Sequence, residues 1–407
     1  MIPLGLKTES FLQATVYLAL LTFLASLTFS TALMEISFVV ALAGWLLLKV
    51  RHPAPFFPLK SKLWAFLLGF IFLSVISFFW SEFPKQSFRG VFKVLKQFFT
   101  FWIVAETLQA PHRRKGAFRV LVGIFILLSL DGMWQYLFGR DLLRQIPVEV
   151  ASSGSRISAS FRNYGLLATF IVSFWPLLAS QLEEERNKNL LFLTALGSAL
   201  GGLLLFWTRL RGGWIAFWIG LVFFLGLQRR RLLLGILIAG TLISLFLLPR
   251  EMTLHLDRLG KEQSLVERFY LWDRAVDVIE ARPWTGTGIN TYAVAHQKYD
   301  RKRSWRVPNY YAHNGYLQIA AETGLPSLVC FLAFLFFYFK NAFRFLGDLS
   351  EEGKKHQVIG ILAGMVGFLI LGLIDTVFHN PQAVMGFWFL AGWGIAVASP
   401  EPVRLTR

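Results

Sequence analysis

Residues 310–339 read YYAHNGYLQIAAETGLPSLVCFLAFLFFYF and change within one stretch from polar and aromatic to almost wholly apolar. The second half, Leu325 to Phe339, carries no charged residue and forms most of a membrane span, which needs about 20 apolar residues. The first half holds His313, and an imidazole is the side chain that titrates near neutral pH. The stretch therefore indicates a membrane protein and places a titratable group at the membrane edge, where it could transfer protons on a lipid-linked substrate.

Apolar runs recur along almost the whole chain of 407 residues, in which 55% of residues are hydrophobic and 16% charged. This composition excludes an ordinary soluble protein. We predict an all-α polytopic membrane protein of about twelve spans, the fourth being the weakest because Arg89, Lys93 and Lys96 line one face of its start. The predicted spans are 11–30, 32–48, 63–80, 92–108, 117–138, 164–181, 189–207, 212–227, 231–249, 320–339, 356–378 and 382–398.

The distribution of basic residues predicts the orientation of these spans. With a cytoplasmic N-terminus, every connection from an even-numbered span to the next odd one is rich in Lys and Arg, as the positive-inside rule requires. The connections concerned are 49–62, 113–115, 186–188, 229–231 and 340–355. We expect both termini in the cytoplasm, and the first apolar run, which has no cleavage-site pattern, to be a retained helix.

The whole chain, 1–407, is predicted to be one membrane domain with one external insertion, residues 250–312. The insertion is strongly basic, so a solvated loop and a site for an anionic substrate both remain open, while nucleic acid is not an expected partner. Apolar residues from Leu265 to Ile279 repeat at spacings of three and four, which predicts an amphipathic helix. For a second external connection, 139–163, a mobile flap and an inert loop also remain open.

His313 is the candidate for chemistry with the best setting. We expect it to begin a helix whose own face carries Ala320 and Gly324, leaving room for a ligand, and the helix N-terminus would favour the neutral imidazole. The alternative is an interfacial histidine that only places its polar tip among the headgroups. The histidines show no short metal-site spacing and Cys330 is the single cysteine, so neither a metal nor another cofactor is expected.

Three further features could bind an anion or support the histidine. Arg209 and Arg211 flank an external junction between two spans, where a helix start and Gly212–Gly213 suit a diphosphate, although anchoring at the headgroups is the alternative. Arg268 lies one turn before Trp272 and could be a second clamp or a surface ion-pair partner. Asp375, at the external end of a span, could orient the histidine or cap a loop.

These motifs together resemble the O-antigen ligase and polymerase family of bacterial inner-membrane glycosyltransferases. His313–Asn314 followed by Gly324 looks like the family's histidine signature. Arg211-Gly212-Gly213-Trp214 is similar to its Ser-Arg-Gly-x-Trp element, although Leu210 stands where serine is usual. The other matching positions are Arg268, Trp272, Ala275, Pro283, Gly286-Thr287-Gly288 and, more loosely, Asn163 with Ala168.

The resemblance implies a fold of twelve helices, similar to the GT-C class, with a large periplasmic loop between helices nine and ten. It implies an undecaprenyl-diphosphate-linked glycan as donor and an inverting, metal-independent transfer at the periplasmic face of the inner membrane. His313 would be the general base, while Arg211, Arg268 and Arg209 would hold the diphosphate. We expect supporting roles for Asn314, Asp375, Glu322 and Trp272.

The resulting hypothesis is an O-antigen ligase with lipid A–core as acceptor and membrane lipids around it. An O-antigen polymerase, which extends the glycan on undecaprenyl diphosphate, is the first alternative. A lipid or glycan transporter is the second, and it would predict inverted repeats or broken helices with charges near the bilayer midplane.

Overall fold

A computed structural model describes residues 4–51, 61–151, 154–246, 263–299, 311–349 and 351–399, and these residues are almost entirely helical. Two short strands, β1 (Glu149–Ala151) and β2 (Gly154–Arg156), pair antiparallel. The helices are α1 (Leu4–Ser26), α2 (Thr31–Arg51), α3 (Lys62–Ile76) with the 3₁₀ turn η1 (Ser77–Trp80), α4 (Pro84–Thr107), α5 (Pro111–Phe138), α6 (Tyr164–Ser180), α7 (Lys188–Trp207), α8 (Arg211–Leu227), α9 (Arg231–Phe246), α11 (Gln263–Ala281), α12 (Tyr292–Tyr299), α13 (Gly315–Thr323), α14 (Leu325–Asp348), α15 (Glu352–Leu371) and α16 (Pro381–Ala398).

Each of the twelve predicted spans falls on a helix, which confirms the all-α membrane fold. Among the described residues, eight helices are long and apolar enough to cross a membrane, namely α1, α2, α3 with η1, α5, α7, α14, α15 and α16. Three shorter apolar helices are α6, α8 and the first part of α9. The remaining predicted span lies on α4, where basic residues lower the apolar character as expected.

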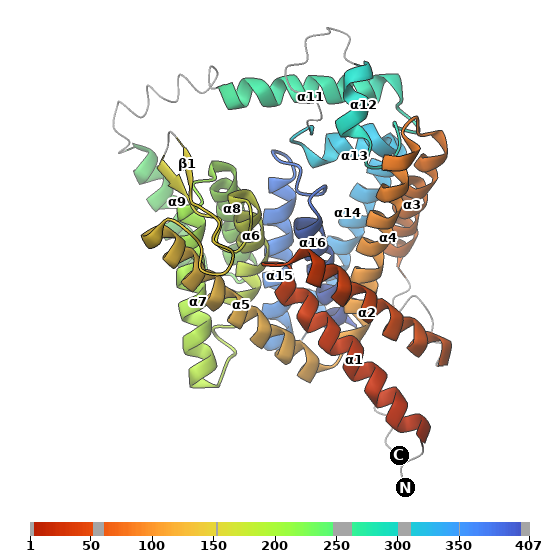
Figure 1. The fold of residues 1–407 in the computed structure, drawn as a ribbon. Coiled ribbons are helices and arrows are strands. Elements are labelled where there is room, and N and C mark those ends of the chain that lie inside the picture. The colour runs from red at the N-terminus through yellow and green to blue at the C-terminus, as the bar shows by residue number, and fades with distance from the viewer. Residues whose placement is uncertain are drawn as a thin grey trace.

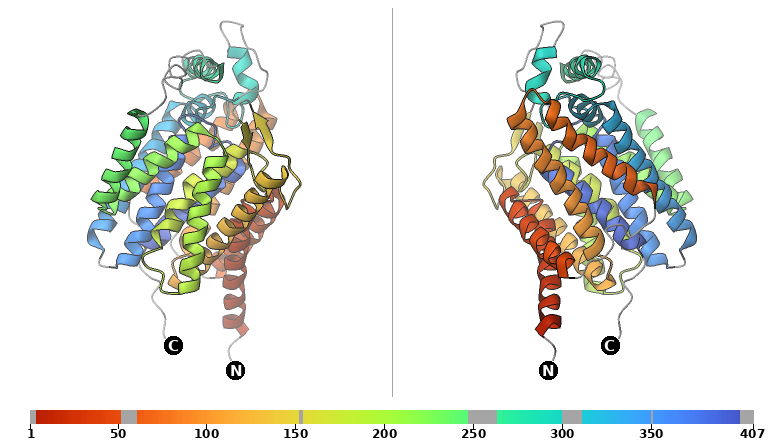
Figure 2. Two further views of the ribbon diagram at one scale, coloured as in Figure 1. Left: turned by 90° about the vertical axis from the view of Figure 1, so that its left-hand side faces the viewer. Right: turned by 90° about the vertical axis from the view of Figure 1, so that its right-hand side faces the viewer.

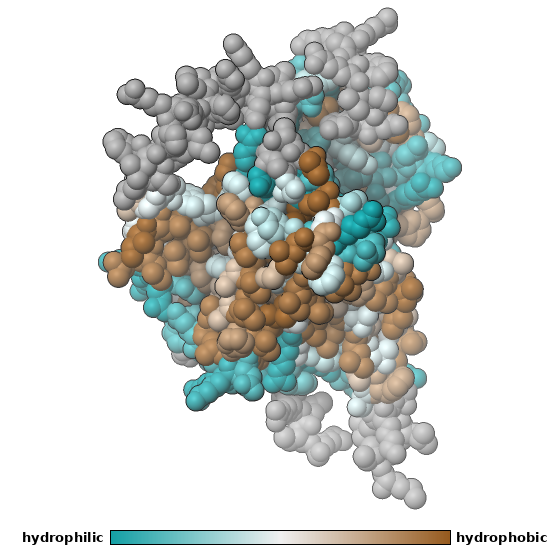
Figure 3. Space-filling model, turned by 60° about the vertical axis from the view of Figure 1, so that its left-hand side comes forward, coloured by the Kyte–Doolittle hydropathy of each residue, from teal (hydrophilic) through white to brown (hydrophobic). Residues whose placement is uncertain are grey.

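The long helices form a bundle around a continuous apolar core. α15 packs against α6 and α8, α16 packs against α4, and α14 packs against α3. The two views of Figure 2 show these helices inclined to one another and α1 projecting past the rest. On the face in Figure 3, apolar side chains gather over the middle and hydrophilic ones lie toward the ends, as a bilayer requires.

The helices of the predicted external insertion lie together at one end of the bundle. α11 and α12 lie across the end opposite the start of α1, directly above α13 (Figure 1). α11 contains the residues of the predicted amphipathic helix, Leu265 to Ile279. α11, α12 and α13 share a small core that includes Ala275, Tyr292 and Ala321. The insertion's residues 250–262 and 300–310 lie outside the described residues.

Two predicted spans have wrong boundaries, and both errors concern this end of the bundle. The span predicted at 320–339 is broken at Gly324, where a φ of 84° ends α13, and α14 begins at Leu325 with Pro326 in its first turn. The span predicted at 356–378 ends at Leu371, and residues 372–380 form a loop before α16. The loop 372–380 lies beside His313, whereas Gly324 lies against the backbone of Trp284 and Thr285.

The other external connection, 139–163, is folded where it is described. Asp141 is fully buried and accepts hydrogen bonds from the backbone N–H groups of Arg144 and Ile146. Arg144 in turn donates to the carbonyl oxygens of Phe29 and Ser160. These bonds join the connection to the α1 and α6 ends.

Candidate active site

His313 lies just outside α13, so the expectation that it begins the helix is wrong. Asn314 is the N-cap residue, and its side chain accepts from the backbone N–H groups of Tyr316 and Leu317. His313 has a φ of 46°, in the left-handed region that side chains other than glycine seldom adopt. The argument from a shared helix face therefore fails, and the backbone turn is what directs this imidazole.

The histidine turns toward the loop between α15 and α16 and meets Asp375. His313 Nδ1 lies 3.2 Å from Asp375 Oδ1, and both side chains are about one-third exposed or less, at 28% and 35%. An ionised carboxylate only accepts hydrogen bonds, so Nδ1 must donate, which leaves Nε2 as the ring nitrogen with a lone pair. Asp375 also accepts from the backbone N–H of Thr376 at 2.7 Å, so it both orients the histidine and caps its loop.

The environment of Asp375 favours its ionised form. Burial raises the pKa of the Asp375 carboxyl, whereas the hydrogen bond from His313, and the charge of that ring when it is protonated, lower it. The backbone N–H of Thr376 and the charge of Arg268 act in the same direction, so the pKa is lowered overall. Arg268 is thus close enough to act on the His313–Asp375 pair through its charge.

α11 lies over this pair and brings Arg268 with it. The indole Nε1 of Trp272 donates to the carbonyl oxygen of His313 at 3.3 Å. Arg268 is four residues earlier and therefore on the same face of the helix. This geometry places the half-buried Arg268 on the side of α11 that faces His313.

The start of α8 approaches the same loop from another side. A Cβ at Gly212 would lie 2.4 Å from Ile374 Cδ1, so the start of α8 lies against the residue preceding Asp375. Arg211 is the first residue of α8 and is exposed, and Arg209, with a φ of 52°, lies in the turn before it.

Glu322 does not face the histidine pair but is a buried acceptor beneath the insertion. Its carboxylate accepts from the backbone N–H groups of Asn290 at 2.8 Å and Tyr292 at 3.2 Å, and from Gln318 Nε2 at 3.1 Å. Burial raises the pKa of this carboxyl, although these hydrogen bonds and the charge of Lys93 oppose the rise. Glu322 therefore fixes the start of α12 against α13.

Several basic residues of the insertion form ion pairs with acidic residues, which agrees with the alternative of a solvated loop. Arg274 is buried and pairs with Asp273 at 2.5 Å and Asp277 at 2.6 Å. Arg282 and Lys298 both pair with Glu82, which lies between η1 and α4. The pairs with Glu82 attach the insertion to the bundle, whereas those of Arg274 lie within α11.

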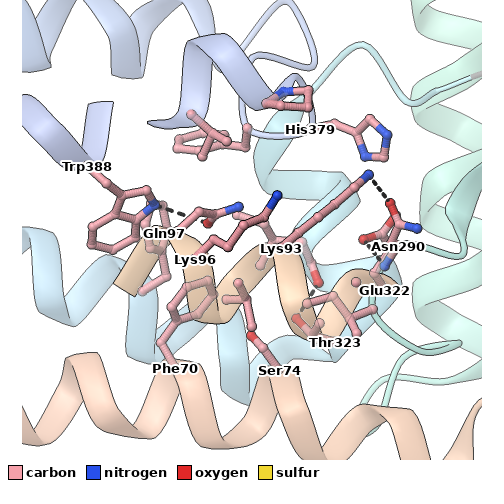
Figure 4. Close-up of a pocket in the computed structure, with 18 of the residues that line it drawn as sticks. Phe70, Ser74, Lys93, Lys96, Gln97, Asn290, Glu322, Thr323, His379 and Trp388 are labelled. Carbon is pink, nitrogen blue, oxygen red and sulfur yellow. Dashed lines mark hydrogen bonds between the residues drawn. The ribbon is translucent and has the colours of Figure 1, made fainter. Parts of the chain in front are cut away.

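Sequence reasoning missed a pocket beside the histidine pair, shown in Figure 4. Lys93 and Lys96 of α4 enter it together with His379. Lys93 Nζ donates to the side-chain oxygen of Asn290 at 2.7 Å, and Gln318 Nε2 lies 3.3 Å from His379 Nδ1. The signal was present in the sequence, because intramembrane lysines are costly and usually placed for function.

Five of the eight predicted site residues, His313, Asn314, Asp375, Arg268 and Trp272, meet at one place. Arg211 and Arg209 border it at the start of α8, and Glu322 lies behind it. Within the part of the chain that the structure describes, no three His, Cys, Asp or Glu residues are grouped as metal ligands.

Two comparisons with known proteins agree with the resemblance found in the sequence. Residues 196–332 match the family model described as O-antigen ligase, and this range includes Arg211, Arg268 and His313 but not Asp375. The chain is also 23% identical over 354 residues to the exopolysaccharide production protein ExoQ of Rhizobium meliloti (strain 1021), covering 82% of this chain and 77% of that protein. The predicted resemblance to this family is thereby confirmed.

Proposed function

We propose that this chain, whose residues 196–332 match the O-antigen ligase family, transfers O-antigen from undecaprenyl diphosphate to lipid A–core at the periplasmic face of the inner membrane. The family supports an enzyme that acts on lipid-linked glycans in a membrane. The observation that carries the mechanism is the His313–Asp375 pair with Arg268 and the start of α8 beside it.

The reaction follows from the two nitrogen atoms of His313. Nδ1 donates to Asp375, so Nε2 can accept the proton of an acceptor sugar hydroxyl. The hydroxyl oxygen then attacks the anomeric carbon of the donor while the bond from that carbon to the diphosphate oxygen breaks. The electron pair of that bond leaves with the diphosphate, and a single displacement inverts the anomeric configuration.

Arg211 and Arg268, with Arg209 near them, would stabilise the charge that develops on the diphosphate. Fixed guanidinium groups form paired hydrogen bonds to phosphate oxygens and neutralise them without reorganisation. The Asp375 carboxylate would stabilise the imidazolium formed in the same step. We therefore expect a chelator such as EDTA to leave the rate of transfer unchanged, and abolition of transfer by the chelator would contradict the metal-independent mechanism.

Polymerisation of the glycan is a second candidate, and the likeness to ExoQ favours it. That relative's name assigns it to exopolysaccharide production, and the likeness extends over most of both chains. A polymerase would use the same donor and the same base but would take a second lipid-linked glycan as acceptor. The residues around His313 serve either acceptor.

The direct test offers the two acceptors separately to purified protein with a lipid-diphosphate glycan. The ligase hypothesis predicts a product only with lipid A–core, whereas a product only with a second donor molecule identifies a polymerase. Transport of the lipid-linked glycan without any transfer would contradict both.

A further inference from the structure

The loop 372–380 separates two chemically different regions. In this loop, Ile374 lies against Gly212 at the start of α8, and the Asp375 carboxylate pairs with His313. On the other side, Phe378 and His379 form part of the wall of the pocket that holds Lys93 and Lys96. The histidine pair therefore lies between an arginine side, formed by Arg211 and Arg268, and this lysine pocket.

The lysine pocket combines a cationic part with an apolar wall. Phe331, Val384 and Trp388 line it, and they come from two helices that span the membrane. Its cavity volume is about 90 Å³, and it is partly open to solvent. Figure 4 shows the Lys93 amino group directed toward Asn290 and His379, with the apolar side chains beneath. This combination suits the phosphate of a lipid whose chain continues into the bilayer.

The pocket holds two ammonium groups and one buried carboxyl group. Lys93 donates to the neutral amide oxygen of Asn290, and Glu322 is the acidic group of the lining whose charge acts on Lys93. Lys96 pairs with Glu35 of α2, and this carboxylate is 42% exposed. The Glu322 carboxylate also lines the pocket, but it already accepts three N–H groups. An ammonium group at an apolar wall gains most from a charged partner, which a lipid phosphate would supply.

We propose that Lys93 and Lys96 bind the phosphate group of the acceptor lipid, while Arg211 and Arg268 bind the diphosphate of the donor. The assignment to the acceptor rests on the proposed transferase function, since a transferase must hold two lipids at once. Both kinds of acceptor considered above carry phosphate, so the chemistry is the same for each. His313, between the two sides, would then meet the acceptor hydroxyl and the donor sugar together.

Binding of dodecyl phosphate to the purified full-length protein tests the anion site without any turnover. We expect two binding sites in the wild type. Lys93→Met should remove one of them or weaken it about tenfold to a hundredfold, as expected for loss of one charge-assisted contact. The double variant Arg211→Ala/Arg268→Ala should affect the other site. Lys85→Gln is the matched control, because Lys85 is an exposed lysine of α4 outside the pocket.

The proposal is overturned if Lys93→Met and Lys96→Met both retain the two sites, or if Lys85→Gln weakens binding equally. Lys96→Met supplies the test if Lys93→Met does not fold. Steady-state transfer then distinguishes the source of the phosphate. We expect Lys93→Met to raise the KM for the acceptor and leave the KM for the donor unchanged, and the reverse result would assign the pocket to the donor. Loss of the proposed function itself would appear as no transfer by the wild type, with phosphate binding intact.

Discussion

At the scale of single residues, the backbone of His313 explains why its role could not be read from helix periodicity. A non-glycine residue in the left-handed region costs about 1 kcal/mol or more, so other contacts must hold it. The hydrogen bond from Trp272 to the His313 carbonyl and the cap of α13 at Asn314 provide those contacts. The sequence indicated His313 and Asp375 separately, but they are 62 positions apart and only the fold brings them to 3.2 Å.

The charge of Asp375 is predicted to matter more than its shape. Asp375→Asn keeps an oxygen that can accept from His313 but removes the negative charge that stabilises an imidazolium. We expect kcat to fall by about tenfold to a hundredfold, within the usual range for general acid–base effects, while the KM for the donor changes little. Glu267→Gln, an exposed site on α11, is the control. An unchanged kcat would show that Asp375 only caps its loop.

His379 is predicted to make the fold sensitive to acid. Burial, with a smaller effect from the charge of Lys93, lowers the pKa of His379 to about 4. The unfolded chain takes up this proton at about pH 6.5, so it binds more protons than the fold between pH 6.5 and 4. Stability should therefore fall as the pH is lowered through that window, by about 3 kcal/mol in total, since each pKa unit is worth about 1.4 kcal/mol.

Thermal unfolding of the wild type and His379→Gln between pH 7 and pH 4.5 measures this contribution. We expect the wild type to lose more stability on acidification than the variant. Parallel losses in the two proteins would contradict a buried neutral His379.

At the scale of elements, the periodic helices could be predicted and the short breaks between them could not. Long apolar runs predict a helix because the bilayer allows few other backbone structures. The break at Gly324 and the loop 372–380 depend instead on one glycine conformation and on the hydrogen bond from Gly315 N–H to the Gly372 carbonyl, at 2.7 Å. These non-local contacts have no periodic signal, and they are the contacts that form the site.

Gly315 is predicted to be essential for bringing these two segments together. A Cβ there would lie 2.3 Å from the ring of Phe378, which is packed among other aromatic rings of the core. Gly315→Ala should therefore displace the loop, separate Asp375 from His313 and lower kcat by about tenfold or more. Gly123→Ala is the matched control, because a Cβ at Gly123 meets no atom within 4 Å. Equal activities of the two variants would contradict this role.

At the scale of the whole molecule, the distribution of polar groups agrees with the proposed reaction at one face. The His313–Asp375 pair, the start of α8 and the helices α11 to α13 lie at the same end of the bundle, opposite the start of α1 (Figure 1). The basic residues of the sequence predicted which connections lie at each end and thus placed the start of the fourth span, with Lys93, at this end. They could not predict that Lys93 meets Asn290 of the insertion. In the sequence, Lys93 only lowers the apolar character of the fourth span. Its hydrogen bond to Asn290 joins segments far apart in the chain and therefore has no local signal.

The central claim is that His313 activates the acceptor hydroxyl, and single-turnover transfer by purified His313→Ala tests it most directly. Donor binding by the variant, measured separately, shows that the fold and the arginine side remain intact. We predict a rate of transfer that is about 10²-fold to 10⁴-fold lower than in the wild type, with donor binding retained. A folded His313→Ala protein that transfers the glycan at the full rate would contradict the mechanism.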